Sequence, residues 1–370
     1  MSPENNLIKF PKYIYILYME KCQCLTTKGI QCSRKAISGS NYCLQHKTCK
    51  IPIQSKTPIQ SKVQIADKSP LILTKKEFED AIANDDANAF YKYDLNVIAN
   101  LFTHLNIQLD KLIETNKPNI VKYALNNKLL NPNSKYGGDN AYALIIAMYE
   151  NNNEIAKILL MNPKIDVNLQ SNDGESILEY AIHRENYEIV KILLEHPKID
   201  VNLGNNGSTP LMEATLGGIY GIYGTHESNK IAKILLDNPE INVNLQDSYG
   251  NTALMFAVKN HEIFLLLIEN PNIDVNLQNE DGETALMIAI NNSRYEVVKL
   301  LINHPNIDVN SQDKHGYTPL MKAMNNSYEI VKLLLGHSEI DIDIESAYGY
   351  TAFQYATNTH NLEMIELFEG

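Results

Sequence analysis

Apolar residues recur along most of this chain at the spacing of amphipathic helices. In Tyr187-Glu188-Ile189-Val190-Lys191-Ile192-Leu193-Leu194 they fall on one helical face. A second helix-forming stretch, such as Thr284-Ala285-Leu286-Met287-Ile288-Ala289-Ile290, alternates with the first kind. The pattern therefore predicts pairs of short helices. Two helices of about ten residues cannot bury their apolar faces alone, so the pairs are expected to stack on one another as a solenoid.

A recurring tetrapeptide gives the period of these pairs, with steps of 34, 42, 32, 34 and 33 residues between successive copies. The copies are Ile165-Asp166-Val167-Asn168, Ile199-Asp200-Val201-Asn202, Ile241-Asn242-Val243-Asn244, Ile273-Asp274-Val275-Asn276, Ile307-Asp308-Val309-Asn310 and, in altered form, Ile340-Asp341-Ile342-Asp343. The step of 42 residues contains an insertion between the two helices, residues 217–226, which we interpret as a surface loop. It is glycine-rich, but no strand leads into it and no Gly-Lys-Ser/Thr follows, so a phosphate-binding loop is excluded.

Turn and cap residues predict where each helix begins and ends. A glycine closes the turn after every tetrapeptide and supplies the positive φ that the turn needs, at Gly174, Gly207, Gly250, Gly282, Gly316 and Gly349. Threonine N-caps two residues later predict the start of the first helix, at Thr209, Thr252, Thr284, Thr318 and Thr351. Prolines predict the end of the second helix, at Pro163, Pro197, Pro239, Pro271 and Pro305.

The order Asp-x-x-Gly-x-Thr-Pro-Leu, then Leu-Leu, then Asp-Val-Asn resembles the ankyrin repeat, over residues 136–370. The resemblance implies an all-α solenoid of helix-turn-helix units, with residues 71–135 as an N-terminal cap and divergent helical repeats. One departure concerns the histidine that usually follows Thr-Pro-Leu and caps a helix through its imidazole. In this chain that position holds Glu179, Met212, Met255, Met287, Met321 and Gln354.

The same resemblance implies that a partner meets the tips of the turns and the exposed side of the first helices, the concave face. The expected partner-binding residues there are Tyr249, Lys314, His315, Tyr317, Tyr348 and Tyr350. Exposed tyrosine is a frequent interface anchor because it buries much area at low entropic cost. The alternative is that tyrosine is simply abundant, at 21 residues. The expected function is a non-catalytic interaction module or adaptor that binds a protein partner, and its oligomeric state stays open.

Charge and cysteine both divide the chain in two. Residues 1–70 hold 11 basic and 3 acidic residues, a net charge of +8, whereas residues 71–370 carry −20. All five cysteines lie between Cys22 and Cys49. The cysteine-free body is therefore not a disulfide-built secreted scaffold, and its negative charge should repel nucleic acid and anionic lipid.

Residues 19–50 form a candidate zinc module. Zn²⁺ prefers four thiolate or imidazole ligands, and a segment with too little core gains its fold from the metal. The expected ligands are Cys22, Cys32, Cys43 and His46, with Cys24 and Cys49 as alternates. The order Cys-x-x-x-Thr-x-x-Gly-x-x-Cys, then Tyr-Cys-x-x-His, resembles a small cysteine-rich module of microbial and viral proteins, and it favours Cys22 over Cys24. Free thiols and disulfides are the alternatives.

The module is basic, so a second function class stays open: a nucleic-acid-associated protein that uses residues 19–70, with the solenoid as a docking arm. The alternatives are a solvated charged surface and contact with an acidic protein. Residues 1–18 are interpreted as an N-terminal tail, and translation from Met19 instead of Met1 is a further hypothesis. The polar, proline-bearing residues 51–70 are interpreted as a flexible linker.

Several function classes are not expected. The apolar run near the start is too short to span a membrane and makes a poor signal peptide, so an intracellular protein is expected. No metalloprotease, nucleophile-elbow or phosphate-loop motif occurs, so we expect no enzyme. The excess of Asn, Ile and Lys and the pairing of modules resemble proteins of large DNA viruses, which implies a host-derived partner and a place in the cytoplasm or nucleus of a host cell.

Overall fold

The computed structural model describes residues 73–136, 141–216, 225–324, 327–358 and 362–369. Residues 1–70, with the predicted tail, zinc module and linker, lie outside these ranges, and so does most of the glycine-rich insertion. The metal-stabilised module therefore stays a prediction. None of the helices within the described ranges is long and apolar enough to cross a bilayer.

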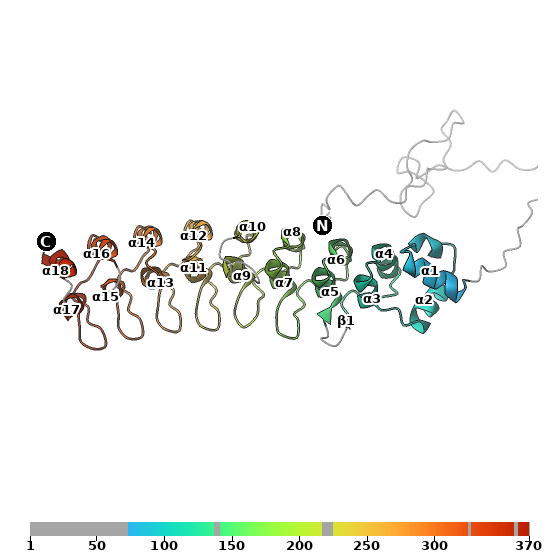
Figure 1. Cartoon of the computed structure of the whole chain (residues 1–370), viewed down its shortest axis with the longest axis horizontal. Helices are drawn as coiled ribbons and strands as arrows, with labels where there is room; N and C mark the ends of the chain where they lie inside the picture. The colour runs from blue at the N-terminus through green and yellow to red at the C-terminus, as the bar shows by residue number, and fades with distance from the viewer. Residues whose placement is uncertain (1–72, 137–140, 217–224, 325–326, 359–361, 370) are drawn as a thin grey trace, which may run out of the picture. The chain divides into compact units, whose positions relative to one another are not determined.

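Seven helix pairs follow one another in the described residues, and they confirm the predicted solenoid of helix-turn-helix units (Figure 1). The first helices of the pairs are α5 (Ala143–Tyr149), α7 (Ile177–His183), α9 (Pro210–Leu216), α11 (Ala253–Ala257), α13 (Ala285–Asn291), α15 (Pro319–Ala323) and α17 (Ala352–Asn358). The second helices are α6 (Asn153–Leu160), α8 (Tyr187–Leu194), α10 (His226–Leu236), α12 (His261–Ile268), α14 (Tyr295–Ile302), α16 (Tyr328–Leu335) and α18 (Leu362–Glu369).

The helices stack in two rows. Figure 1 shows the first helices in one row, from which the turns project, and the second helices in the other. Each first helix packs on its own second helix and on the next first helix, as α13 packs on α14 and α15. A first helix is therefore enclosed on most sides: in α13 only Ile288 and Asn291 are not fully buried. This enclosure explains why the first helices are so rich in Ala, Leu and Met.

The segment before the repeats is also helical but less regular. It contains α1 (Lys75–Ala83), the 3-10 helix η2 (Ala87–Phe90), α2 (Leu95–His104), α3 (Leu109–Glu114) and α4 (Pro118–Asn126). The rings of Phe78, Phe90 and Phe102 lie 5.2 to 6.4 Å apart at its centre. The helices α3 and α4 pack on α5 and α6, so they continue the stack as a divergent pair.

One small departure from an all-α fold occurs at the first turn. Strands β1 (Lys135–Tyr136) and β2 (Ala141–Tyr142) form a short antiparallel ladder there, with Lys135 opposite Tyr142. The later turns at 170–176 and 246–252 have single bridges in the same place. The turns therefore have the backbone of a hairpin, because their two arms run antiparallel over a few residues.

The predicted helix starts are confirmed. The hydroxyls of Thr252, Thr284 and Thr318 accept hydrogen bonds from the backbone amides three residues on, as N-caps do. The residues that replace the usual histidine supply part of its role. Glu179 and Gln354 each accept a hydrogen bond at 2.8 Å from the amide of the N-cap residue, and so complete a capping box.

The predicted ends of the second helices are confirmed at the five prolines. The second helices α6, α8, α10, α12 and α14 each end three residues before the proline of their repeat, as α6 ends at Leu160 before Pro163. However, α16 ends at Leu335 at the same place, although Ser338 stands where the others have proline. Proline is therefore not required for a second helix to end at this place.

The recurring asparagine of the tetrapeptide joins neighbouring repeats. The Nδ2 of Asn276 donates to the carbonyl of Asn306 at 2.6 Å, and its Oδ1 accepts from the amide of Asp308 at 2.9 Å. The same pair of bonds occurs at the five tetrapeptide asparagines and at Asn133, one repeat before them. We call these six residues the asparagine ladder: Asn133, Asn168, Asn202, Asn244, Asn276 and Asn310. Through the ladder, one backbone carbonyl and one backbone amide at the base of each repeat form hydrogen bonds with an asparagine of the repeat before it.

Two further features fix the turns against one another. The side chain of Gln278 donates to the carbonyls of Gly282 and Gln312 at 2.8 Å, which ties its own turn to the next. At the tips, the amide of Lys314 donates to the carbonyl of Asp281 at 3.0 Å. This approach is close enough that a Cβ on Gly282 would lie 2.7 Å from the Lys314 nitrogen. Glycine is therefore required there by contact with the next repeat as well as by its φ of 74°.

Candidate functional site

The turn tips and the outward side of the first helices form one surface, which we call the first-helix face. One position on each first helix, four residues after the N-cap, reaches this face and is half-buried in every repeat. It holds Ile146, Tyr180, Glu213, Phe256, Ile288, Lys322 and Tyr355. Its helical neighbours are fully buried Ala, Leu or Met in most repeats. The side chain at this position thus differs from repeat to repeat, whereas the buried residues around it stay similar.

Four tyrosines at the C-terminal end of this face form a continuous aromatic strip: Tyr317, Tyr348, Tyr350 and Tyr355. The ring centroid of Tyr317 lies 5.4 Å from that of Tyr355 and 6.2 Å from that of Tyr348. Tyr350 lies 5.6 Å from Tyr355. Tyr348 and Tyr350 are 60% and 43% exposed, and Tyr317 and Tyr355 are half-buried. The strip is therefore held by its inner rings and open at its outer ones.

Hydroxyl groups fix the inner rings of the strip. The Oη of Tyr355 lies 3.1 Å from Oγ of Ser346, in the neighbouring turn. A hydrogen bond with Tyr355 raises the pKa of the Tyr317 hydroxyl to about 12. The Tyr317 phenol is consequently protonated over the physiological range and adds no charge to the strip.

The structure brings most of the predicted partner-binding residues together but separates one. His315 is exposed and its ring lies 6.4 Å from Tyr317, and Lys314 on the same tip forms an ion pair with Asp281. Tyr249 is 67% exposed on a tip two repeats away and, within the described residues, its ring contacts no other aromatic ring. Its backbone carbonyl accepts a hydrogen bond from Glu280 instead. Tyr249 thus shares the face with the strip but is not part of it.

Sequence reasoning missed Tyr355, which joins the two halves of the strip. A signal for it does exist in the sequence. Aligning the repeats with one another shows that the fourth position after the N-cap varies from Ile to Glu, Lys and Tyr, whereas its neighbours keep Ala, Leu or Met at most places. A helix position that varies within a regular repeat is expected to face outward rather than into the core.

A charged cluster lies beside the strip. The ammonium group of Lys322 is 2.8 Å from a carboxylate oxygen of Glu283 and 2.8 Å from one of Asp313. Its side chain is only 14% exposed and that of Asp313 only 4%. Burial opposes the charge, but the hydrogen bonds from Lys322 and from the amides of Tyr317 and His315 lower the pKa of Asp313. Asp313 therefore stays ionised and holds the turn that carries Tyr317.

A second cluster occupies the corresponding place near the N-terminal end of the face. The imidazole of His183 lies between two carboxylates, with Nδ1 2.5 Å from Glu175 and Nε2 2.8 Å from Glu213. Hydrogen bonds with Glu175 and then Glu213 raise the pKa of His183 to about 10. The protonated imidazole thus joins two successive repeats, and it takes the place that Asn291 holds beside Glu283.

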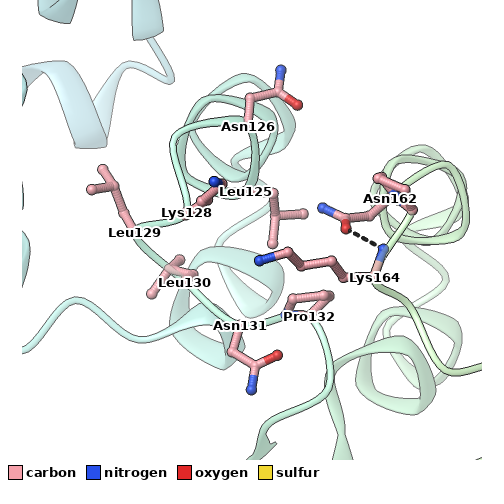
Figure 2. A pocket seen from close by; sticks show the side chains of 10 residues that line it. Leu125, Asn126, Lys128, Leu129, Leu130, Asn131, Pro132, Asn162 and Lys164 are labelled. Atoms are coloured by element: carbon pink, nitrogen blue, oxygen red, sulfur yellow. Dashed lines mark hydrogen bonds between the residues drawn. The ribbon is translucent and has the colours of Figure 1, made fainter.

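A depression on the described surface lies elsewhere, where α4 meets the first regular repeats. Its walls include Leu125, Leu129, Leu130 and Pro132, and Figure 2 shows the side chain of Lys164 extending across it. The backbone amide of Lys164 donates to Oδ1 of Asn162 at 3.0 Å, which holds this loop in place. None of the predicted partner-binding residues lines it, so it is separate from the first-helix face.

The described ranges contain no group of three or more His, Cys, Asp or Glu residues arranged to hold a metal ion. The predicted zinc ligands all lie in residues 1–70, outside those ranges, so this finding does not bear on them. The expectation that the chain is not an enzyme also stays a prediction.

Comparison with known proteins identifies the class. The family model for ankyrin repeats in three copies matches residues 144–225, 205–279, 221–313, 264–346 and 306–369. These segments cover more than half of the 370 residues, so the chain belongs to the ankyrin-repeat family. Ankyrin repeats form extended surfaces that bind other proteins, and the class that the fold defines is therefore a protein-interaction module.

Two crystal structures are among those similar to this chain. The ankyrin repeat domain of Bcl-3, a unique member of the IkappaB protein family, is 22% identical, with a TM-score of 0.52 over 63% of this chain and 100% of that domain. This likeness supports the fold. The ankyrin repeat protein EF0377 is 27% identical over 52% of this chain and 96% of its own, with a TM-score of 0.46. No curated protein sequence matches the chain.

Proposed function

We propose that this chain is an intracellular adaptor whose ankyrin repeats hold a protein partner on the first-helix face, with the aromatic strip as the main contact. The observation that supports this most directly is the strip itself. Tyr348 and Tyr350 are exposed, whereas Ala352 and Ala356 of the same repeat are buried in the core. The two rings are therefore not part of the core. Exposed aromatic rings in mutual contact are typical of interface hot spots, because they offer area that is already ordered.

Affinity capture from cell lysate tests the proposal. The full chain is compared with the double variant Tyr348→Ser/Tyr350→Ser, which changes the two most exposed rings of the strip. A matched control is Tyr295→Ser/Tyr328→Ser, at the start of α14 and α16, where the rings are 39% and 37% exposed but lie on second helices. We expect a protein that the wild type and the control retain and the strip variant loses, with unchanged helicity. Equal retention by all three chains would contradict the proposal.

A separate proposal concerns the cysteine-rich segment, and the spacing of its residues supports it. We propose that Cys22, Cys32, Cys43 and His46 hold one structural Zn²⁺, with Cys24 and Cys49 outside the set. Metal analysis of the purified full chain should give about one zinc per chain. Cys32→Ser should abolish the bound zinc, whereas Cys24→Ser should keep it. Loss in both variants would move the site to a different ligand set.

The alternative function, association with nucleic acid through residues 19–70, rests on the net charge of +8 in residues 1–70. It predicts binding of the full chain to DNA or RNA that weakens steeply as salt is raised, because released counterions drive such binding. Filter binding at low and at physiological salt measures this. No binding at low salt would leave the protein-binding proposal as the function.

A further inference from the structure

We infer that the partner offers an arginine-bearing, positively charged segment whose guanidinium groups lie on the aromatic strip. This inference rests on the proposed function, since it names the chemistry of what the first-helix face binds. Three observations support it: the geometry of the rings, the charge around them and the state of the amines nearby.

The geometry favours a planar cation. The ring planes of Tyr317 and Tyr348 meet at 46°, those of Tyr317 and Tyr355 at 49°, and those of Tyr350 and Tyr355 at 61°. Inclined rings do not cover one another as a parallel stack would, and Tyr348 and Tyr350 keep 60% and 43% of their surface open. The electron-rich face of an open tyrosine ring attracts cations, and arginine is the cation found there most often.

The charge around the strip has the complementary sign. The three turns that surround it, with Lys322, contain five carboxylates and two amines. The carboxylates are Glu280, Asp281, Glu283, Asp313 and Glu345, and the amines are Lys314 and Lys322. The local excess is thus three negative charges on the side of the molecule where the tyrosines are exposed.

The two amines do not cancel this excess, because both are already engaged. Lys314 pairs with Asp281, and Lys322 lies between Glu283 and Asp313. Glu280 and Glu345 are exposed and take part in no ion pair within the described residues. A cationic segment that reaches the strip therefore finds carboxylates within the neighbouring turns, and like-charge repulsion disfavours an acidic one.

Arginine fits better than lysine for two reasons. Its guanidinium is planar and weakly hydrated, so it loses less hydration when it stacks on a ring. Its five N–H donors also allow hydrogen bonds to a flanking carboxylate while the guanidinium stacks on a ring. A purely apolar segment would use the rings but would leave the acidic border without partners.

Selection of short linear peptides on the immobilised full chain tests the inference. The probe is a displayed random library, and the readout is which residues are enriched. We expect enrichment of arginine and a positive net charge. A selected peptide is then remade with citrulline, which keeps the shape of arginine without its charge, and this exchange should weaken binding about tenfold or more.

Substitutions on the chain separate the ring from mere apolar area. Tyr348→Phe/Tyr350→Phe keeps both ring faces and should keep affinity within about threefold, whereas Tyr348→Leu/Tyr350→Leu should weaken it about tenfold. Tyr295→Leu/Tyr328→Leu is the matched control on second helices and should bind as the wild type does. Circular dichroism and melting temperature verify that each variant is folded.

Each other outcome overturns a defined statement. Enrichment of proline-rich or acidic peptides that the Leu variant loses would overturn the arginine inference and keep the face as a protein-binding site. Peptides that bind the Leu variant as tightly as the wild type would overturn both. If no peptide is enriched, the partner is not a short segment and the inference fails, while capture from lysate still decides the proposed function.

Discussion

The base of the repeat stack and the first-helix face differ in how much their residues vary from repeat to repeat. At the base, the asparagine ladder repeats the same residue six times, because each side chain must satisfy one donor and one acceptor of the next repeat. On the first-helix face, the fourth position after the N-cap holds apolar, acidic, basic and aromatic residues in turn. The difference indicates that the uniform edge holds the stack together and that the variable edge carries the specificity of binding.

Substitution of a turn glycine should have the largest effect on stability. In Gly282→Ala the added Cβ would lie 2.7 to 2.9 Å from the backbone of Asp313 and Lys314, in addition to the strain of a φ of 74°. We expect a loss of about 3 kcal/mol in the free energy of unfolding, measured by chemical denaturation.

Gly349→Ala is the matched control for that experiment. Its φ is also 74°, but nothing lies within 4 Å of the added Cβ. Only the backbone strain remains, so we expect a loss of about 1 kcal/mol. Equal losses in the two variants would mean that φ alone, and not contact between repeats, requires glycine at these turns.

Removal of a ladder residue should come next. Asn276→Ala deletes the bonds to the carbonyl of Asn306 and the amide of Asp308, and we expect a loss of about 2 kcal/mol. Asn303→Ala is the control, because the side-chain amide of Asn303, the C-cap of α14, donates to the carbonyl of Lys299 in its own repeat and, within the described residues, to none in the next. Thermal melting of both variants measures the difference. If the two melt together, the ladder does not contribute to stability.

The His183 cluster should make stability depend on pH. The folded-state pKa of His183 is raised from 6.5 to about 10, so its contribution is complete below about pH 6.5 and is lost as the pH rises toward 10. Asparagine is the residue at the corresponding position 291 and does not titrate, so His183→Asn is the matched variant. We expect its free energy of unfolding to fall by about 1 kcal/mol less than that of the wild type as the pH rises. Unfolding measured at pH 6 and pH 9.5 checks this, and parallel pH profiles would rule out the link.

A substitution at the variable position should have the smallest effect. Ile288→Lys introduces the residue type that the next repeat has at this position, Lys322, although Asn251 and Asn279 stand where Lys322 meets Glu283 and Asp313. A lysine can extend its ammonium group to solvent from a half-buried position, so we expect stability to change by less than about 1 kcal/mol. The contrast is Leu286→Ala two residues earlier, where a fully buried side chain is cut back and about 3 kcal/mol should be lost. A comparable loss for Ile288→Lys would show that packing constrains this position, and the first-helix face would then not be free to vary.

Much of the fold follows from the sequence because the signals are local. A glycine with positive φ, a threonine that caps the amide three residues on, and apolar residues at helical spacing each act within a few residues, and all six predicted turn glycines have positive φ. Repetition adds to this, since the same local pattern recurs in register. The sequence could therefore determine the helix pairs and the family before any contact between repeats was known.

Only the tertiary structure decided which side chains of successive repeats contact one another. The asparagine of the tetrapeptide was visible as a repeat, but its partners lie about thirty residues away. The same holds for the contact that brings Tyr355 against Tyr317, for the separation of Tyr249 from them, and for the imidazole of His183 between Glu175 and Glu213. Stacking sets these contacts, because side chains from successive repeats meet only when the helices pack.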